Sequence, residues 1–216
     1  MRLAGRKLIA KVREHYRPLK VASPLAVPET ADQSAVMPRY FALLRGINVG
    51  GHRVKMDRLR ELVEALGFEH VETFIASGNV IFSSASGDVH AMEERIAQQL
   101  QEALGYEVPT LIRSQSELDS ITSFEPSEPA PTDQSVYVIF LPEAADAELR
   151  RSLDDLGTDT DRFEFAGREV YWLVRGKLSE SPLFGMGLAK MTGGASTTMR
   201  NMTTVRKLVA KYPKRD

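Results

Sequence analysis

The stretch Leu44-Arg45-Gly46-Ile47-Asn48-Val49-Gly50-Gly51-His52-Arg53-Val54-Lys55 joins two segments of different periodicity. An apolar run over residues 40–44 precedes it and favours a buried strand. Residues 56–66 follow it and repeat apolar side chains at helical spacing. A glycine-bearing turn that ends a strand and opens a helix is a common ligand site, because free backbone amides gather at the start of the helix. We therefore start both the fold and the search for a site from this loop.

Outward from the loop, the first half of the chain predicts the order β-α-β-β-α-β. Ser77-Gly78 separates two short β-rich runs and indicates a tight hairpin. Asp88 can cap a long helix, and Ser114-x-x-Glu117 is a capping box that predicts a further short helix. The expected elements are strand 39–45, helix 56–66, strands 70–76 and 79–83, a helix from 88 to Gly105, and strand 107–113.

The same order is predicted again after a segment that holds Pro126, Pro129 and Pro131. Its expected elements are strand 135–141, a helix with Leu149, Leu153 and Leu156, strands 162–166 and 169–174 around Gly167, helix 180–190, strand 196–200, and a last helix capped by Asn201. We therefore predict an α+β protein, a tandem duplication of two ferredoxin-like β-α-β-β-α-β units, each followed by an extra helix. The predicted domains are 1–37 (a disordered N-terminal extension), 38–125 and 132–216.

The first 36 residues have the composition of a linker, with prolines at 18, 24 and 28 among small and polar residues. We expect them to be a mobile extension, and a start of the protein at Met37 is one interpretation of this pattern.

Composition narrows the class of protein. The chain of 216 residues has no cysteine, which excludes disulfides, thiolate metal sites and a cysteine nucleophile and fits a reducing compartment. No apolar run approaches the ~18 residues of a membrane span. We expect a cytoplasmic protein without a membrane partner. The net charge of −1 hides two basic ends around an acidic middle, which indicates either solvated helix ends or an anion-binding face.

The glycine loop does not match a nucleotide-binding motif. Gly46 and Gly51 have the spacing of a Walker A loop, but His52 and Arg53 stand where that loop needs lysine and then serine or threonine. The remaining features are glycines that allow a positive φ and a nearby cluster of basic side chains, Arg45, Arg53 and Lys55. They favour either anion binding or a simple crossover loop.

Two further polar stretches lie at predicted element ends. Ser77-Gly78-Asn79 is ordinary turn chemistry, because a nucleophilic serine would need a base and a strand-to-helix elbow. Residues 197–208 place hydroxyls, Arg200 and Asn201 at a helix start, which suits a phosphate or carboxylate as well as plain capping. The four histidines lack metal-ligand spacing, so we expect no metal and no cofactor.

Three separated motifs resemble a bacterial family of unknown function, number 1697. They are residues 40–51 with Lys55-Met56, residues 75–82, and residues 198–208. The resemblance runs from about Met37 to the C-terminus and implies a duplication of ferredoxin-like units, but it implies no activity. The family usually has tryptophan at the position of Met202 and threonine at that of Met199. If the tryptophan contacts a ligand, binding should be altered here, and if it lies in the core, methionine can fill its place.

We hypothesise that the three stretches converge on one anion site for a phosphate-bearing ligand, a nucleotide or a nucleic acid. Its expected residues are Arg45, Asn48, Gly50, Gly51, Lys55, Ser77, Asn79, Thr198, Arg200 and Asn201. An enzyme that acts on a phosphorylated metabolite is an alternative, although no base stands near Ser77 or His52 in the sequence and the catalytic residues are not predicted. A protein-interaction or dimerisation module is the other alternative, favoured by a contiguous apolar surface patch.

Overall fold

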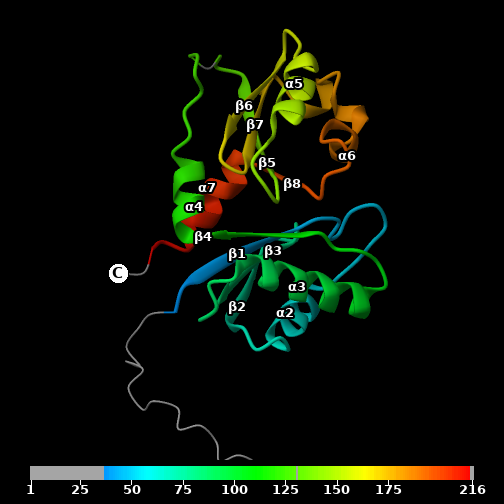
Figure 1. Cartoon of the computed structure of the whole chain (residues 1–216), viewed down its shortest axis with the longest axis vertical. Helices are drawn as coiled ribbons and strands as arrows, with labels where there is room; N and C mark the ends of the chain where they lie inside the picture. Colours follow the sequence, from blue (N-terminus) through cyan, green and yellow to red (C-terminus); the bar gives the residue numbers. More distant parts are fainter. Residues whose placement is uncertain (1–36, 130, 215–216) are drawn as a thin grey trace, which may run out of the picture. The chain divides into compact units, whose positions relative to one another are not determined.

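Two four-stranded antiparallel sheets carry the fold (Figure 1). A computed structural model describes residues 37–129 and 131–214, which belong to one unit of the chain. The expectation of a mobile extension over residues 1–36 lies outside the described residues.

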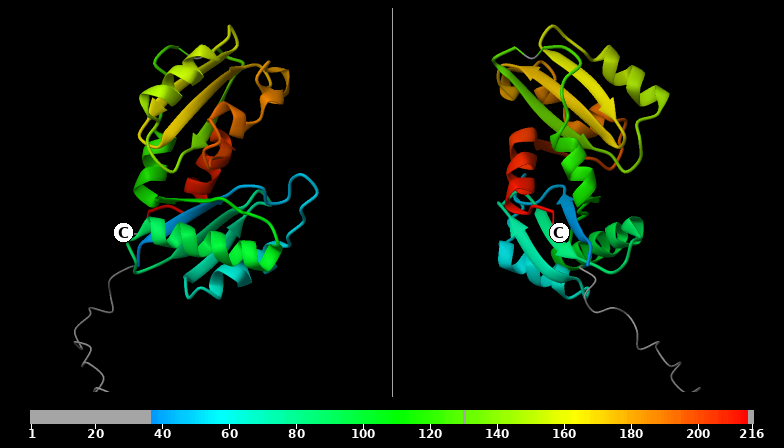
Figure 2. Two further views of the ribbon diagram at one scale, coloured as in Figure 1. Left: turned by 45° about the vertical axis from the view of Figure 1, so that its right-hand side comes forward. Right: turned by 90° about the vertical axis from the view of Figure 1, so that its left-hand side faces the viewer.

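The first sheet has the strand order β2-β3-β1-β4, in which every pair of neighbours is antiparallel. Two helices cover one of its faces, and Figure 2 shows both on the side away from the second sheet. The elements are β1 (Arg39–Leu44), α2 (Met56–Glu64), β2 (Glu69–Phe74), β3 (Asn79–Ser83), α3 (Val89–Leu104) and β4 (Thr110–Ser114).

The second sheet has the order β6-β7-β5-β8, again with antiparallel neighbours. Relative to chain order, this is the same arrangement as in the first sheet. The elements are β5 (Gln134–Phe140), α5 (Ala147–Asp155), β6 (Asp161–Ala166), β7 (Glu169–Arg175), the 3₁₀ turns η1 (Leu178–Glu180) and η2 (Phe184–Met186), α6 (Leu188–Met191) and β8 (Thr198–Asn201).

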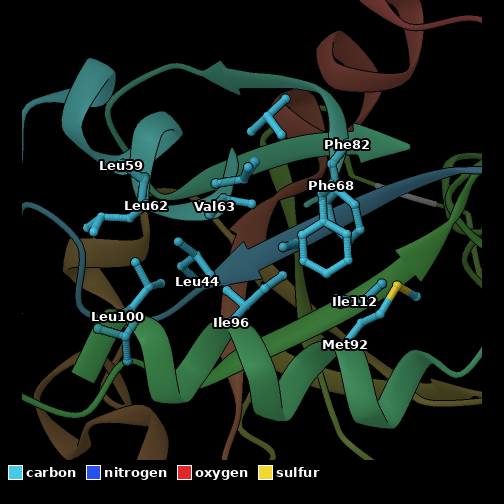
Figure 3. Packing of buried hydrophobic residues seen from close by; sticks show 14 of the residues in the cluster. Leu44, Leu59, Leu62, Val63, Phe68, Phe82, Met92, Ile96, Leu100 and Ile112 are labelled. Atoms are coloured by element: carbon cyan, nitrogen blue, oxygen red, sulfur yellow. The ribbon is translucent and has the colours of Figure 1, made fainter. Parts of the chain in front are cut away.

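The uninterrupted apolar run of β1 is explained by burial on both faces. Alternate side chains of a strand point to opposite faces, so Ala42 and Leu44 meet α2 and α3, while Phe41 and Leu43 face the second sheet. Figure 3 shows the first of these cores, in which Ile96 from α3 packs beneath Leu44. A third cluster fills the space between the second sheet and α5.

A short helix follows each sheet, and both lie between the two sheets (Figure 2). They are α4 (Gln115–Thr122) and α7 (Met202–Lys211), and each begins directly where the last strand of its sheet ends. The predicted capping box is confirmed, because the Ser114 side chain accepts from Glu117 N while the Glu117 carboxylate accepts from Ser114 N. The predicted Asn201 cap is also confirmed, by a 2.8 Å bond from Thr203 N.

The predicted helix over residues 180–190 is wrong. Two 3₁₀ turns and the four-residue α6 replace it, because Gly187 adopts φ 79° and ψ 141°, which no helix contains. The predicted Ser77-Gly78 hairpin is a wider turn over residues 75–78, and the strand expected from residue 107 begins at Thr110. The chain is thus an α+β protein, and no helix of the described residues is long and apolar enough to cross a membrane.

Candidate functional site

The three polar stretches singled out in the sequence border one cleft of about 640 Å³. It lies where β1 ends, where β2 turns into β3, and where β8 passes into α7. Its lining consists of residues 44–49 and 75–77, Tyr137, Leu188, residues 198–201, and Thr204. The topology explains why these segments meet. The end of β1 and the β2–β3 turn belong to the first sheet, and they face the end of β8, which belongs to the second.

Six of the ten predicted site residues line the cleft: Arg45, Asn48, Ser77, Thr198, Arg200 and Asn201. Gly50, Gly51 and Lys55 are exposed and lie outside the lining, so the far side of the glycine loop points away from the cleft. Asn79 is 1% exposed and lies beneath the cleft surface, against Arg200.

The N–H groups of the Arg200 guanidinium donate their hydrogen bonds to oxygens of the protein itself. Nε donates to Asn79 Oδ1 at 2.7 Å, and Nη1 donates to Thr198 Oγ1 and to the Met199 carbonyl at 2.8 Å each. Nη2 donates to the carbonyl oxygens of Leu44 (2.9 Å) and Gly78 (3.1 Å). A guanidinium has five N–H groups, so a ligand would have to displace a protein acceptor. Arg200 therefore ties the second sheet to the first.

Burial lowers the pKa of Arg200 to about 10, which leaves it charged at neutral pH. All its acceptors are neutral oxygens, and no carboxylate of the described residues pairs with it. A folded protein tolerates a charge buried this deeply only when the charged group is fully hydrogen-bonded, as Arg200 is. Its field is not cancelled by a nearby anion, so it adds positive potential beneath the cleft.

Two of the three asparagines in the predicted set, Asn48 and Asn79, brace the backbone. Asn48 Nδ2 donates to the carbonyls of Val54 and Ala76, and Asn48 Oδ1 accepts from Val54 N. Asn79 Nδ2 donates to Phe74 O and Ser77 Oγ. Asn48 therefore closes the glycine loop and fixes it to the β2–β3 turn, while Asn79 closes that turn.

Among the described residues, the polar groups still open to a ligand include those of four side chains besides the Tyr137 hydroxyl. Arg45 is half-buried and its guanidinium makes no hydrogen bond or ion pair with any described residue. Ser77 Oγ accepts one bond and keeps its O–H, and Asn201 uses only its Oδ1 for capping. Thr204, in the first turn of α7, lines the same wall. These groups are donors suited to an anion.

No carboxylate lines the cleft, as far as the described residues go, and its charged groups are Arg45 and Arg200. The equivalent place in the other half differs. There a cleft of about 410 Å³ lies between α4 and the β6–β7 turn, and Arg168 Nη2 meets Glu117 Oε1 at 2.6 Å. Glu117 is the third residue of α4, and Thr204 is the third residue of α7. One cleft is therefore neutralised by the chain itself, and the other keeps its positive charge.

Sequence reasoning missed Ile75, Tyr137, Leu188, Met199 and Thr204 as lining residues. Thr204 could have been found by comparing the predicted starts of α4 and α7. The third residue of α4 is the glutamate of a capping box, and Thr204 is the third residue of α7. Tyr137 and Leu188 come from elements of the second sheet that carry no unusual motif, so only the fold brings them here.

Met199 and Met202, where we expect the sequence to depart from the family pattern, have different surroundings. Met202 is 4% exposed and packs in the core between the sheets, so it fills core volume rather than the cleft. Met199 is half-buried and lines the cleft.

The family described as "Protein of unknown function (DUF1697)" matches residues 37–171, and the chain belongs to this family. The sequence resemblance is thus confirmed over residues 37–171, and the closing motif over residues 198–208 lies outside the matched range. Among solved structures, the conserved bacterial protein SP0830 from Streptococcus pneumoniae is similar, with a TM-score of 0.63 and 22% sequence identity over 83% of this chain and 100% of that one. At this identity the likeness concerns the fold alone. A comparison with curated proteins found no match.

Proposed function

We propose that the cleft between the glycine loop, the β2–β3 turn and the start of α7 binds a phosphate-bearing ligand. The observation that carries the proposal is the unpaired guanidinium of Arg45 in a cleft whose lining, within the described residues, has no carboxylate. A guanidinium can form two parallel hydrogen bonds to a phosphate, which makes it the side chain best suited to this anion.

Three features support the choice of an anion over a neutral ligand. The buried charge of Arg200 lies behind the cleft, and no acid of the part of the chain that the structure describes neutralises it. The first turn of α7 opens onto it, and helix starts carry partial positive charge. The matching cleft of the other half fills the same place with the Arg168–Glu117 ion pair. The binding residues of the proposal are Arg45, Ser77, Asn201 and Thr204, with Asn48, Asn79, Thr198 and Arg200 as its frame.

A titration of the full chain with inorganic phosphate and with pyrophosphate tests the proposal, read by calorimetry at constant ionic strength. Arg45→Ala should weaken binding about tenfold to a hundredfold, the worth of a hydrogen bond to a charged group. Arg53→Ala is the matched control, because Arg53 is an exposed arginine of the same loop outside the lining. Its affinity should stay within about twofold of the wild type.

Two results would end the proposal: no binding of either anion, or equal loss in the two arginine variants. Arg45→Ala should unfold at the same urea concentration as the wild type, because its side chain holds no described partner. A short oligonucleotide in the same titration separates a nucleic-acid ligand from a small one. Tighter binding of the oligonucleotide with a steep salt dependence would identify the former.

We also propose that the chain is a tandem duplication of ferredoxin-like units. The two strand orders, β2-β3-β1-β4 and β6-β7-β5-β8, and the helix that follows each sheet support it. The cytoplasmic location expected from the absence of cysteine stays a prediction.

A further inference from the structure

Three large apolar side chains of the described residues are strongly exposed, namely Val49 (59%), Ile75 (51%) and Phe184 (56%). Single exposed hydrophobic residues are normal and scattered over a protein surface. These three gather around one place. Val49 and Ile75 line the proposed anion cleft, and Phe184 lines a small apolar pocket of about 90 Å³ that shares Leu188 and Met199 with the cleft.

Ile75 is also strained. It adopts φ 50°, the left-handed region in which a β-branched side chain is a clear outlier. A turn at this position would be more stable with glycine or asparagine, and an exposed isoleucine gains nothing from burial. Strain of this kind is typically retained where the residue takes part in function. Asn48, at φ 57°, is tied to the same turn through the Ala76 carbonyl, so the two outliers form one rim.

The lining of the cleft therefore combines two kinds of surface. Arg45, Ser77, Asn201 and Thr204 offer donors. Ile75, Val49, Leu188 and Met199 offer apolar surface, continued by Trp172 and Phe184 in the small pocket. Ligand sites usually combine a mostly apolar wall with a few polar groups that fix orientation.

We infer that the ligand is amphipathic: a phosphate monoester whose alcohol part is a short aliphatic or aromatic group. This rests on the proposed function and names its ligand class. The cleft volume of about 640 Å³ lies in the range of small-molecule sites. The adjoining pocket of about 90 Å³ is smaller than the ~150 Å³ cavity that holds a benzene ring. It therefore takes a short aliphatic group or the edge of a ring, while the rest of the ligand lies against Ile75 and Tyr137.

Phenyl phosphate, inorganic phosphate and phenol are the probes, titrated into the full chain at constant ionic strength. Phenyl phosphate should bind about tenfold tighter than inorganic phosphate, as expected when one side of a ring is buried. Ile75→Gly should reduce the affinity for phenyl phosphate about fivefold and leave that for inorganic phosphate unchanged. Glycine accepts a positive φ without strain, so this variant should keep its fold.

His70→Gly is the matched control. His70 is exposed, adopts φ 51° in β2, and lies outside the cleft lining. It relieves the same kind of strain and should change neither affinity.

Each other result overturns the inference in a recognisable way. If phenyl phosphate binds no tighter than inorganic phosphate, while Arg45→Ala weakens both, the amphipathic ligand is wrong and the anion site stands. If no probe binds, both proposals fall. If the wild type sediments as a dimer and Ile75→Gly as a monomer, the apolar rim serves a second copy of the chain rather than a ligand.

Discussion

Arg113 and Arg200 make equivalent contacts in opposite directions across the two sheets. Arg113, on β4, donates to the carbonyls of Leu141 and Arg168 and to the carboxylate of Glu169. Arg200, on β8, donates to the carbonyls of Leu44 and Gly78 and to the amide oxygen of Asn79. The registers agree as well, because Arg113 stands opposite Phe41 on β1 and Arg200 opposite Val138 on β5.

These two arginines join the sheets by directional bonds in a layer whose other buried side chains are mostly apolar. Both arginines lie on edge strands, and their side chains extend over the face that the sheets share. Arg113 reaches the end of β5 and the start of β7, and Arg200 reaches the end of β1 and the start of β3. Each also donates to the carbonyl of its own preceding residue. Hydrophobic contact alone would let the sheets slide, whereas three hydrogen bonds from each arginine to the other half define one position.

Replacement of either arginine by methionine should destabilise the protein. Arg200→Met leaves neutral oxygens without donors, and we expect a loss of about 2–4 kcal/mol in the free energy of unfolding. Arg113→Met leaves the Glu169 carboxylate, 11% exposed as a side chain, without its partner at 2.6 Å. We expect a larger loss of about 3–5 kcal/mol. Urea denaturation measures both, and an equal or reversed order would contradict the account.

Neutralisation of the orphaned acid should restore part of that loss. We expect Arg113→Met combined with Glu169→Gln to be more stable than Arg113→Met alone by about 1–3 kcal/mol, since no buried charge is left unpaired. Glu143→Gln, at an exposed position, is the control second change and should restore nothing. Equal stability of the two double variants would show that the ion pair is not the source of the cost.

Gly78 and Gly46 separate backbone strain from steric conflict. Both have a positive φ, of 73° and 80°. A Cβ at Gly78 would lie 3.0 Å from Ile47 Cβ and 3.1 Å from Leu44 Cβ, whereas one at Gly46 would meet nothing within 4 Å. Gly46→Ala should therefore cost about 1–2 kcal/mol, the strain alone. Gly78→Ala should cost at least ~2 kcal/mol more by urea denaturation, because buried side chains must move. Similar costs would refute the close approach.

The stability of the second half should depend on the charge of Asp161. Burial alone raises the pKa of this carboxyl, but hydrogen bonds from Ser181, Thr160, Trp172 and Thr158 outweigh it and hold the pKa below the ordinary 3.8. A lowered folded pKa stabilises the protein fully above pH 3.8, and this part is lost as the pH falls through the folded value.

Asp161→Asn should accordingly cost about 1.5–3 kcal/mol at pH 7. The difference from the wild type should shrink at pH 3 and below. Urea midpoints at pH 7, 5 and 3 measure it, and a difference that does not change with pH would contradict the role of the charge.

Periodicity and capping signals predicted nearly every strand and helix, because those features are local. The continuous apolar run of β1, the box at Ser114 and the cap at Asn201 each act within a few residues. The prediction of a helix over residues 180–190 failed because Gly187 adopts φ 79° and ψ 141° and divides the segment into short turns. For the cleft, the polar and glycine-bearing stretches predicted which segments line it, but they did not predict which side chains brace the fold and which face the cleft. Nothing in the sequence distinguishes Arg45, whose side chain has no partner among the described residues, from Arg200, whose Nε donates to Asn79, 121 residues away.

Arg113 and Arg200, each bonded to the opposite half, also affect the two fragments that a cut in the proline-bearing segment between the halves would give. Each fragment would hold an arginine whose carbonyl acceptors lie on the other fragment. Each half would also expose the apolar layer between the sheets, so separate expression should give poorly soluble halves. Mixing the two halves should rebuild the native assembly without a peptide bond between them.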